Sequence, residues 1–154
     1  MAKKIFGDSI DYSKVKIVTG KDRGLWGTIL TAGLPEGSAV TSGNTIYFPG
    51  YDPNDRSDQA TLMHEMTHVY QRETHGWLGY QWGKLIDRGS GTYTPALDAS
   101  KSFNDYSFEE QASIVRTYYY GWIIPPPGQG PVREMTTDEK TLTETMLKKE
   151  GLLK

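Results

Sequence analysis

Two hydrophobic periodicities divide the chain into a strand-rich first third and a helical remainder. Apolar and polar residues alternate over residues 15–19, and a β-branched run over residues 44–48 ends at Pro49 and Gly50. Both patterns predict strands of a small N-terminal sheet. Residues 26–31 carry further β-branched side chains and are predicted as another strand.

Apolar residues recur at helical spacing after the turn-rich residues 51–55, and they predict a helix over about residues 57–73 with Ser57 or Asp58 as its N-cap. The apolar positions are Leu62, Met63, Met66, Val69 and Tyr70. A second helix is expected over residues 77–86. Residues 89–103 read as a loop with room for one short strand.

Two capping boxes mark later helices. Ser107 with Glu110 opens a helix expected over about residues 108–120, which three consecutive prolines at 125–127 bring to an end. Thr136 with Glu139 opens a short C-terminal helix, expected to dock loosely after the proline-rich stretch.

These elements predict an α+β fold. A small mixed or antiparallel N-terminal sheet is expected to pack on the helix over residues 57–73 and on the helix over residues 108–120. A chain of 154 residues has the length of one ordinary domain. We assign residues 1–124 to that domain and residues 125–154 to a proline-rich linker with a short helix.

Charge and hydropathy argue against a nucleic-acid partner and against a membrane-spanning segment. Seventeen Lys and Arg against 19 Asp and Glu give a net charge of -2, which makes a nucleic-acid partner unexpected. The sequence has neither an apolar signal-peptide core nor a run of about 20 apolar residues that would span a membrane. The default expectation is a cytoplasmic protein, with a specialised secretion system as the route left open for export.

The absence of cysteine confines metal ligands to His, Asp and Glu. His64, Glu65 and His68 form an HExxH motif, in which two imidazoles four residues apart face the same side of a helix and can share one metal ion. Glu65 then lies beside the metal, where it can act as a base. The alternative is a pair of solvated histidines, but the uncharged residues around the motif favour a buried helix.

A tetrahedral zinc site needs a third protein ligand from elsewhere in the fold. Glu109 is the preferred candidate because the N-terminus of its capped helix favours an ionised carboxylate. Glu110 is the immediate rival, although the capping box gives it a local role. His75, Asp98 and Asp105 remain alternatives.

The motifs resemble those of a known family. Residues 61–70 resemble the extended zincin consensus, and residues 109–112 resemble the glutamate helix of gluzincin zinc metallopeptidases. More narrowly, four segments resemble small bacterial zinc peptidases described as Vgr-related or Rhs-associated, and these are residues 6–12, 43–48, 64–71 and 106–115.

The resemblance implies a zincin-like fold with one Zn²⁺ per chain on His64, His68 and Glu109. It implies peptide-bond hydrolysis, with Glu65 assisting the attack of a zinc-bound water. One residue departs from the pattern: Ser113 stands where thermolysin-type gluzincins carry an Asp that orients the first histidine. Support for that imidazole must therefore come from elsewhere or be weak.

Further roles follow from the resemblance. A Tyr or His is expected to stabilise the oxyanion, and the candidates are Tyr106, Tyr119, Tyr120 and His75. An edge strand before the motif helix is expected to dock an extended peptide, and the residues are Asn44, Thr45, Ile46 and Tyr47. The alternatives are ordinary core packing for the tyrosines and an ordinary core strand for the segment.

Two functions compete. The first is a zinc-dependent endopeptidase that acts on a peptide or protein substrate. The second is a zinc-stabilised, non-catalytic binding or accessory module with a partner in a bacterial secretion or toxin-delivery system.

Overall fold

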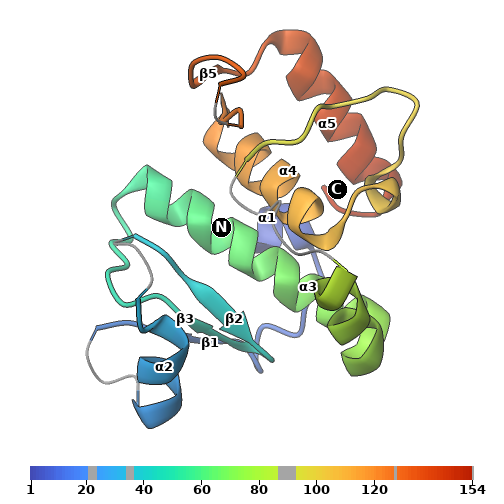
Figure 1. The fold of residues 1–154 in the computed structure, drawn as a ribbon. Coiled ribbons are helices and arrows are strands. Elements are labelled where there is room, and N and C mark those ends of the chain that lie inside the picture. The colour runs from blue at the N-terminus through green and yellow to red at the C-terminus, as the bar shows by residue number, and fades with distance from the viewer. Residues whose placement is uncertain (21–23, 34–36, 87–92, 127, 154) are drawn as a thin grey trace.

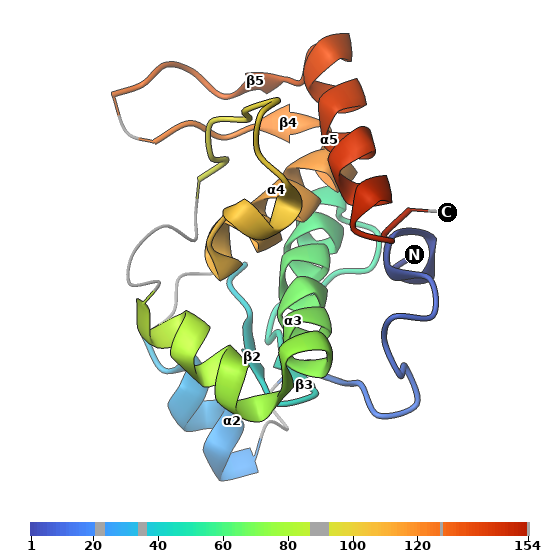
Figure 2. The same cartoon turned by 90° about the vertical axis from the view of Figure 1, so that its right-hand side faces the viewer.

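A long helix, α3 (Arg56–Ile86), runs through the middle of the molecule (Figure 1). The computed structural model describes residues 1–20, 24–33, 37–86, 93–126 and 128–153. A three-stranded sheet lies on one side of α3, and helices α4 (Phe108–Tyr120) and α5 (Thr137–Lys149) lie on the other (Figures 1 and 2). The expected α+β class, with small sheets and several helices, is confirmed.

The three-stranded sheet has the order β1-β3-β2. Strand β1 (Lys16–Val18) runs parallel to β3 (Thr45–Tyr47), and β2 (Val40–Ser42) runs antiparallel to it. A two-residue turn joins β2 to β3, and its first residue, Gly43, has a φ of 63°, which glycine adopts without strain. The strands expected near residues 15–19 and 44–48 are confirmed, whereas β2 was not predicted.

The sheet order corrects one prediction. Residues 44–47 were expected to form an edge strand, but β3 pairs with β1 on one side and with β2 on the other. Both of its edges are therefore occupied. Among the described strands, β2 and β1 form the edges of this sheet.

The strand predicted over residues 26–31 is wrong, because these residues belong to helix α2 (Gly24–Thr31). The hydroxyls of Thr28 and Thr31 donate to the carbonyl oxygens of Gly24 and Gly27, four residues earlier, at 2.9 and 2.7 Å. These bonds let threonine, a β-branched residue, fit a helix despite its strand preference.

Helix α3 consists of two arms that meet at Gly76, whose φ of 69° and ψ of 173° are not helical. The two helices expected over residues 57–73 and 77–86 correspond to these arms. The predicted N-cap is wrong by two or three positions. The carboxylate of Asp55 accepts hydrogen bonds from the backbone nitrogens of Ser57 and Asp58, so Asp55 caps the helix.

Helix α4 begins and ends where its sequence signals predict. The Ser107 side chain accepts from the Glu110 nitrogen, the Glu110 carboxylate accepts from the Ser107 nitrogen at 2.9 Å, and Gly121 follows the last turn in a left-handed conformation. A 3₁₀ turn, η1 (Phe103–Asp105), precedes it. Of the loop expected over residues 89–103, residues 89–92 lie outside the described part, and residues 93–102 form no strand.

The C-terminal segment packs on the main core. Strands β4 (Trp122–Ile123) and β5 (Arg133–Glu134) pair across the proline-rich stretch. Leu147 and Leu152 are fully buried in the same cluster as Ile5 of helix α1 (Lys3–Phe6). The expectation of a loosely docked helix is therefore wrong. No helix in the described residues is long and apolar enough to cross a membrane.

Candidate metal centre

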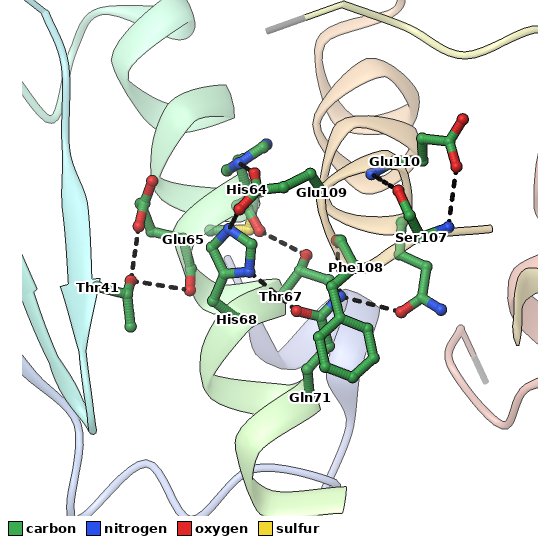
Figure 3. Close-up of polar contacts among 12 residues, drawn as sticks. Thr41, His64, Glu65, Thr67, His68, Gln71, Ser107, Phe108, Glu109 and Glu110 are labelled. Carbon is green, nitrogen blue, oxygen red and sulfur yellow. Dashed lines mark hydrogen bonds and ion pairs between the residues drawn. The ribbon is translucent and has the colours of Figure 1, made fainter. Parts of the chain in front are cut away.

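The HExxH residues lie in the first arm of α3, on the buried face that contacts Thr41 of the sheet and Glu109 of α4 (Figure 3). His64, Glu65 and His68 are each less than a tenth exposed. The four-residue spacing places both imidazoles on one side of the helix, with ring centroids 5.0 Å apart. Burial of three such polar side chains is costly unless they have partners.

Glu109 supplies the partner from the first turn of α4 (Figure 3). Its two carboxylate oxygens lie 3.2 Å from His64 Nε2 and 3.4 Å from His68 Nε2. In a tetrahedral zinc site with bonds of about 2.0–2.2 Å, neighbouring ligand atoms are roughly 3.3–3.6 Å apart. The two observed distances, one from each carboxylate oxygen, are close to that spacing, and two imidazoles with one carboxylate are a donor set that zinc takes.

The protonation states also suit a divalent cation. Burial lowers the pKa of His64 below its ordinary value, which favours the neutral ring that binds metal. Burial alone would raise the pKa of Glu109, but its hydrogen bonds with His64 and His68 outweigh this effect and hold that pKa well below its usual range. Glu109 is therefore ionised, as a metal ligand must be.

Glu65 lies near the same point but has a different partner. A carboxylate oxygen of Glu65 lies within 4.8 Å of a ligand atom of each histidine, so by distance alone it competes with Glu109 as a ligand. Thr41 of β2, however, donates to Glu65 Oε2 at 2.6 Å (Figure 3). Glu109 thus contacts both imidazoles, whereas Glu65 contacts Thr41.

Gln71 orients the second histidine. Its side-chain oxygen lies 2.9 Å from His68 Nδ1, and its amide nitrogen donates to the backbone oxygen of Phe108 and to Gln111 Oε1 (Figure 3). Because the Gln71 oxygen only accepts, His68 Nδ1 donates to it, and Nε2 is the ring nitrogen that faces Glu109 and that, once deprotonated, can bind a metal ion. Gln71 thus joins α3 to the start of α4 behind the site.

This network predicts the effect of replacing Gln71. A Gln71→Leu variant is expected to bind zinc about 10- to 100-fold more weakly, because the His68 ring loses the acceptor that sets its orientation. Competition with a chromophoric chelator measures the affinity. Gln59→Leu, on the same helix but hydrogen bonded to Tyr119, is the control and should leave zinc affinity unchanged. Equal affinities for Gln71→Leu and the wild type would exclude the orienting role.

The first histidine has weaker support. His64 Nδ1 is buried and makes no hydrogen bond to a described residue. Ser113 is fully buried one turn after Glu109 on α4. The resemblance to gluzincins predicted an Asp that orients the histidine at this position. The two histidines are therefore held unequally.

A cavity of about 350 Å³ opens over the site. Its described lining consists of Gly37, Ser38, Ala39, Val40, Thr41, Thr61, His64, Glu65, His68, Glu109 and Arg116. Arg116 carries the permanent positive charge in this set, and burial lowers its pKa. The volume is in the range of pockets that hold small ligands or a few residues of a peptide.

The structure does not bring the predicted oxyanion donors to this cavity. The Tyr106 hydroxyl bonds to the Ala96 oxygen and the Asp98 nitrogen, and the Tyr119 hydroxyl donates to Gln59. Tyr120 packs near Trp122, and the exposed His75 ring lies 5.1 Å from the Phe108 ring. None of Tyr106, Tyr119, Tyr120 and His75 is among the described residues that line the cavity, so their expected role stays a prediction that this lining does not support.

The alternative third ligands also have other roles. Glu110 is occupied by its capping box with Ser107. Asp98 accepts from Ser100, and Asp105 accepts from Ser102. Neither aspartate is among the described residues that line the cavity.

Sequence reasoning missed Thr41, Gln71 and Arg116. The sequence could have indicated Gln71, because this residue follows His68 by three positions and therefore lies on the same face of the helix. Arg116 follows Glu109 by seven residues, two helical turns along α4. No sequence pattern indicated Thr41, because β2 was not predicted and Thr41 lies 24 residues from Glu65 in the chain.

Known proteins share the segment that carries this site. A family model described as the eCIS core domain matches residues 5–76, which include the sheet and the HExxH motif. The type VI secretion system spike protein VgrG2b of Pseudomonas aeruginosa is 32% identical over 124 residues, or 77% of this chain and 12% of that protein. The chain thus spans about an eighth of the length of this relative.

A solved structure shares the fold. The effector domain of Pseudomonas aeruginosa VgrG2b matches with a TM-score of 0.56 and 26% identity, covering 99% of this chain and 78% of the other. The chain is thus similar in sequence and in fold to the effector domain of a secretion-system spike protein, which supports a Vgr-related protein.

Proposed function

We propose that this protein is a zinc-dependent metallopeptidase of the gluzincin type. The observation that supports the proposal most is the meeting of His64 Nε2, His68 Nε2 and the Glu109 carboxylate at 3.2 and 3.4 Å, at the base of an open cavity. Three protein ligands with room for a fourth are typical of catalytic zinc sites, whereas structural sites are closed by four.

Each residue has a definite task in the proposed reaction. A bound zinc ion would supply Lewis-acid activation of water and of a carbonyl group. Glu65 accepts a proton from the attacking water while the water oxygen forms a C–O bond to the peptide carbonyl carbon. Glu65 later delivers this proton to the leaving amine, and the C–N bond breaks. Gln71 keeps His68 oriented throughout.

The shape of the cavity supports a peptide substrate. Strand β2 and the residues before it form one wall, and β2 is an edge strand in the described sheet. An extended peptide can add to such an edge through backbone hydrogen bonds. We therefore assign the docking strand to β2 in place of the segment 44–47.

Metal removal tests this proposal. The purified protein should contain about one zinc per chain and hydrolyse fluorescein-labelled casein, should lose hydrolysis after chelation, and should regain it with one equivalent of zinc. Zinc content by mass spectrometry and fluorescence release measure the two quantities. Stoichiometric zinc without hydrolysis of casein or of a broad peptide library would contradict the peptidase function.

The second candidate is a zinc-stabilised accessory module of a secretion or toxin-delivery system. Two observations support it. The chain is similar to the VgrG2b effector domain, and a binding module can have this similarity without catalysing a reaction. His64 also has weaker hydrogen-bond support than His68, because its Nδ1 has no hydrogen bond to a described residue. This candidate predicts that chelation lowers the melting temperature while neither zinc nor Glu65 produces turnover. A calorimetric scan with and without chelator, beside the casein assay, separates the two candidates.

A further inference from the structure

The hydroxyl of Thr41 is hydrogen bonded to the residue proposed as the base. Thr41 Oγ1 lies 2.6 Å from Glu65 Oε2 and 3.3 Å from the Glu65 backbone oxygen (Figure 3). A hydroxyl has one proton, and the shorter distance assigns it to the carboxylate. This distance lies at the short end of the range for O–H···O hydrogen bonds.

Burial makes this bond hard to replace. Thr41 and Glu65 are each 6% exposed, so bulk water has little access to the carboxylate oxygen that Thr41 contacts. A buried carboxyl group that loses its hydrogen-bond partner keeps its desolvation cost. The Glu65 side chain is therefore held in one orientation, with Oε2 directed to β2.

Thr41 also belongs to the strand proposed to dock a peptide. Thr41 is the middle residue of β2, pairs with Ile46 of the central strand, and lines the cavity beside Glu65. Its side chain leaves the sheet on the face that meets α3 (Figure 3). A peptide docked on β2 would thus lie beside the residue that orients the base.

We propose that Thr41 is a positioning residue, which fixes the Glu65 carboxylate for proton transfer and links the peptide-docking strand to the base. This inference rests on the proposed peptidase function. Thr41 is hydrogen bonded to Glu65 and not through one of the three proposed zinc ligands, so its effect is expected on the rate of the chemical step rather than on metal binding.

Two variants separate the hydroxyl from the shape of the side chain. Thr41→Val keeps the branched shape and loses the hydroxyl, and Thr41→Ser keeps the hydroxyl. On labelled casein, Thr41→Val should lower kcat about 10- to 100-fold with KM within about twofold, because a misplaced group near the reacting atoms costs rates of this order. Thr41→Ser should stay within about threefold of the wild type. A Thr41→Val enzyme with wild-type kcat, or a Thr41→Ser enzyme as slow as Thr41→Val, overturns the proposal.

A second readout does not depend on activity. Crystal structures of the zinc-free wild type, Thr41→Val and Thr41→Ser should show Glu65 turned away from β2 in Thr41→Val only, and an unmoved Glu65 in Thr41→Val overturns the proposal. Thr41→Ala replaces Thr41→Val if that variant does not fold. If the wild type cleaves no substrate, the peptidase function fails, while the orientation of Glu65 still decides whether Thr41 positions it.

Discussion

Glu65→Gln is expected to abolish most hydrolysis while leaving zinc in place. The amide cannot accept the proton of the attacking water, and loss of a general base costs about 10²- to 10⁴-fold in rate. The substitution keeps size and shape, and the amide oxygen can still accept the Thr41 hydroxyl, so the fold around the site should be retained. Casein hydrolysis and zinc content, measured on the same preparation, give both quantities.

Glu134→Gln is the matched control for that variant, because Glu134 is an exposed residue of β5 on another part of the surface. It should match the wild type in zinc content and in rate. Wild-type turnover by zinc-loaded Glu65→Gln would remove Glu65 from the mechanism. Loss of zinc from Glu65→Gln would show instead that Glu65 is a ligand.

Glu109→Ala is expected to weaken zinc binding by about 10²- to 10³-fold. Zinc binding free energies of about 10–16 kcal/mol are shared among four ligands, so each ligand contributes roughly 2.5–4 kcal/mol. The variant also removes a carboxylate that contacts both His64 Nε2 and His68 Nε2. Competitive titration with a chelator of known affinity measures the loss.

Glu110→Ala provides the adjacent control. Glu110 is the next residue, but its carboxylate closes the capping box on Ser107. Its removal should lower the free energy of unfolding by about 0.5–2 kcal/mol, as the loss of a cap does, without changing zinc affinity. The opposite pattern, with zinc lost in Glu110→Ala and kept in Glu109→Ala, would reverse the assignment of the third ligand.

Much of the site could be predicted because its signals are local in sequence. The HExxH spacing determines which side of α3 the two histidines share, and the capping box of Ser107 and Glu110 determines where α4 begins. Glu109 follows from the second signal, because it lies in the first turn of that helix. The meeting of the two helices, however, is seen only in the structure.

The remaining features depend on contacts between distant segments. Strand β2 is short and pairs through residues that carry no strong alternation, so nothing in the sequence placed Thr41 beside Glu65. Residues 26–31 were predicted as a strand because threonine prefers strands. In helix α2 the threonine hydroxyls instead donate to carbonyl oxygens four residues earlier, which the prediction did not consider. The tyrosines were chosen by residue type, and the fold directs Tyr106 and Tyr119 to other partners.

Anomalous diffraction at the zinc edge tests the central claim most directly. Crystals of the zinc-loaded protein should give one peak per chain, within about 2.0–2.2 Å of His64 Nε2, His68 Nε2 and a Glu109 oxygen, with a fourth position open to the cavity. A peak that lacks Glu109, a site closed by a fourth protein ligand, or no peak between α3 and α4 would contradict a catalytic zinc centre in this protein.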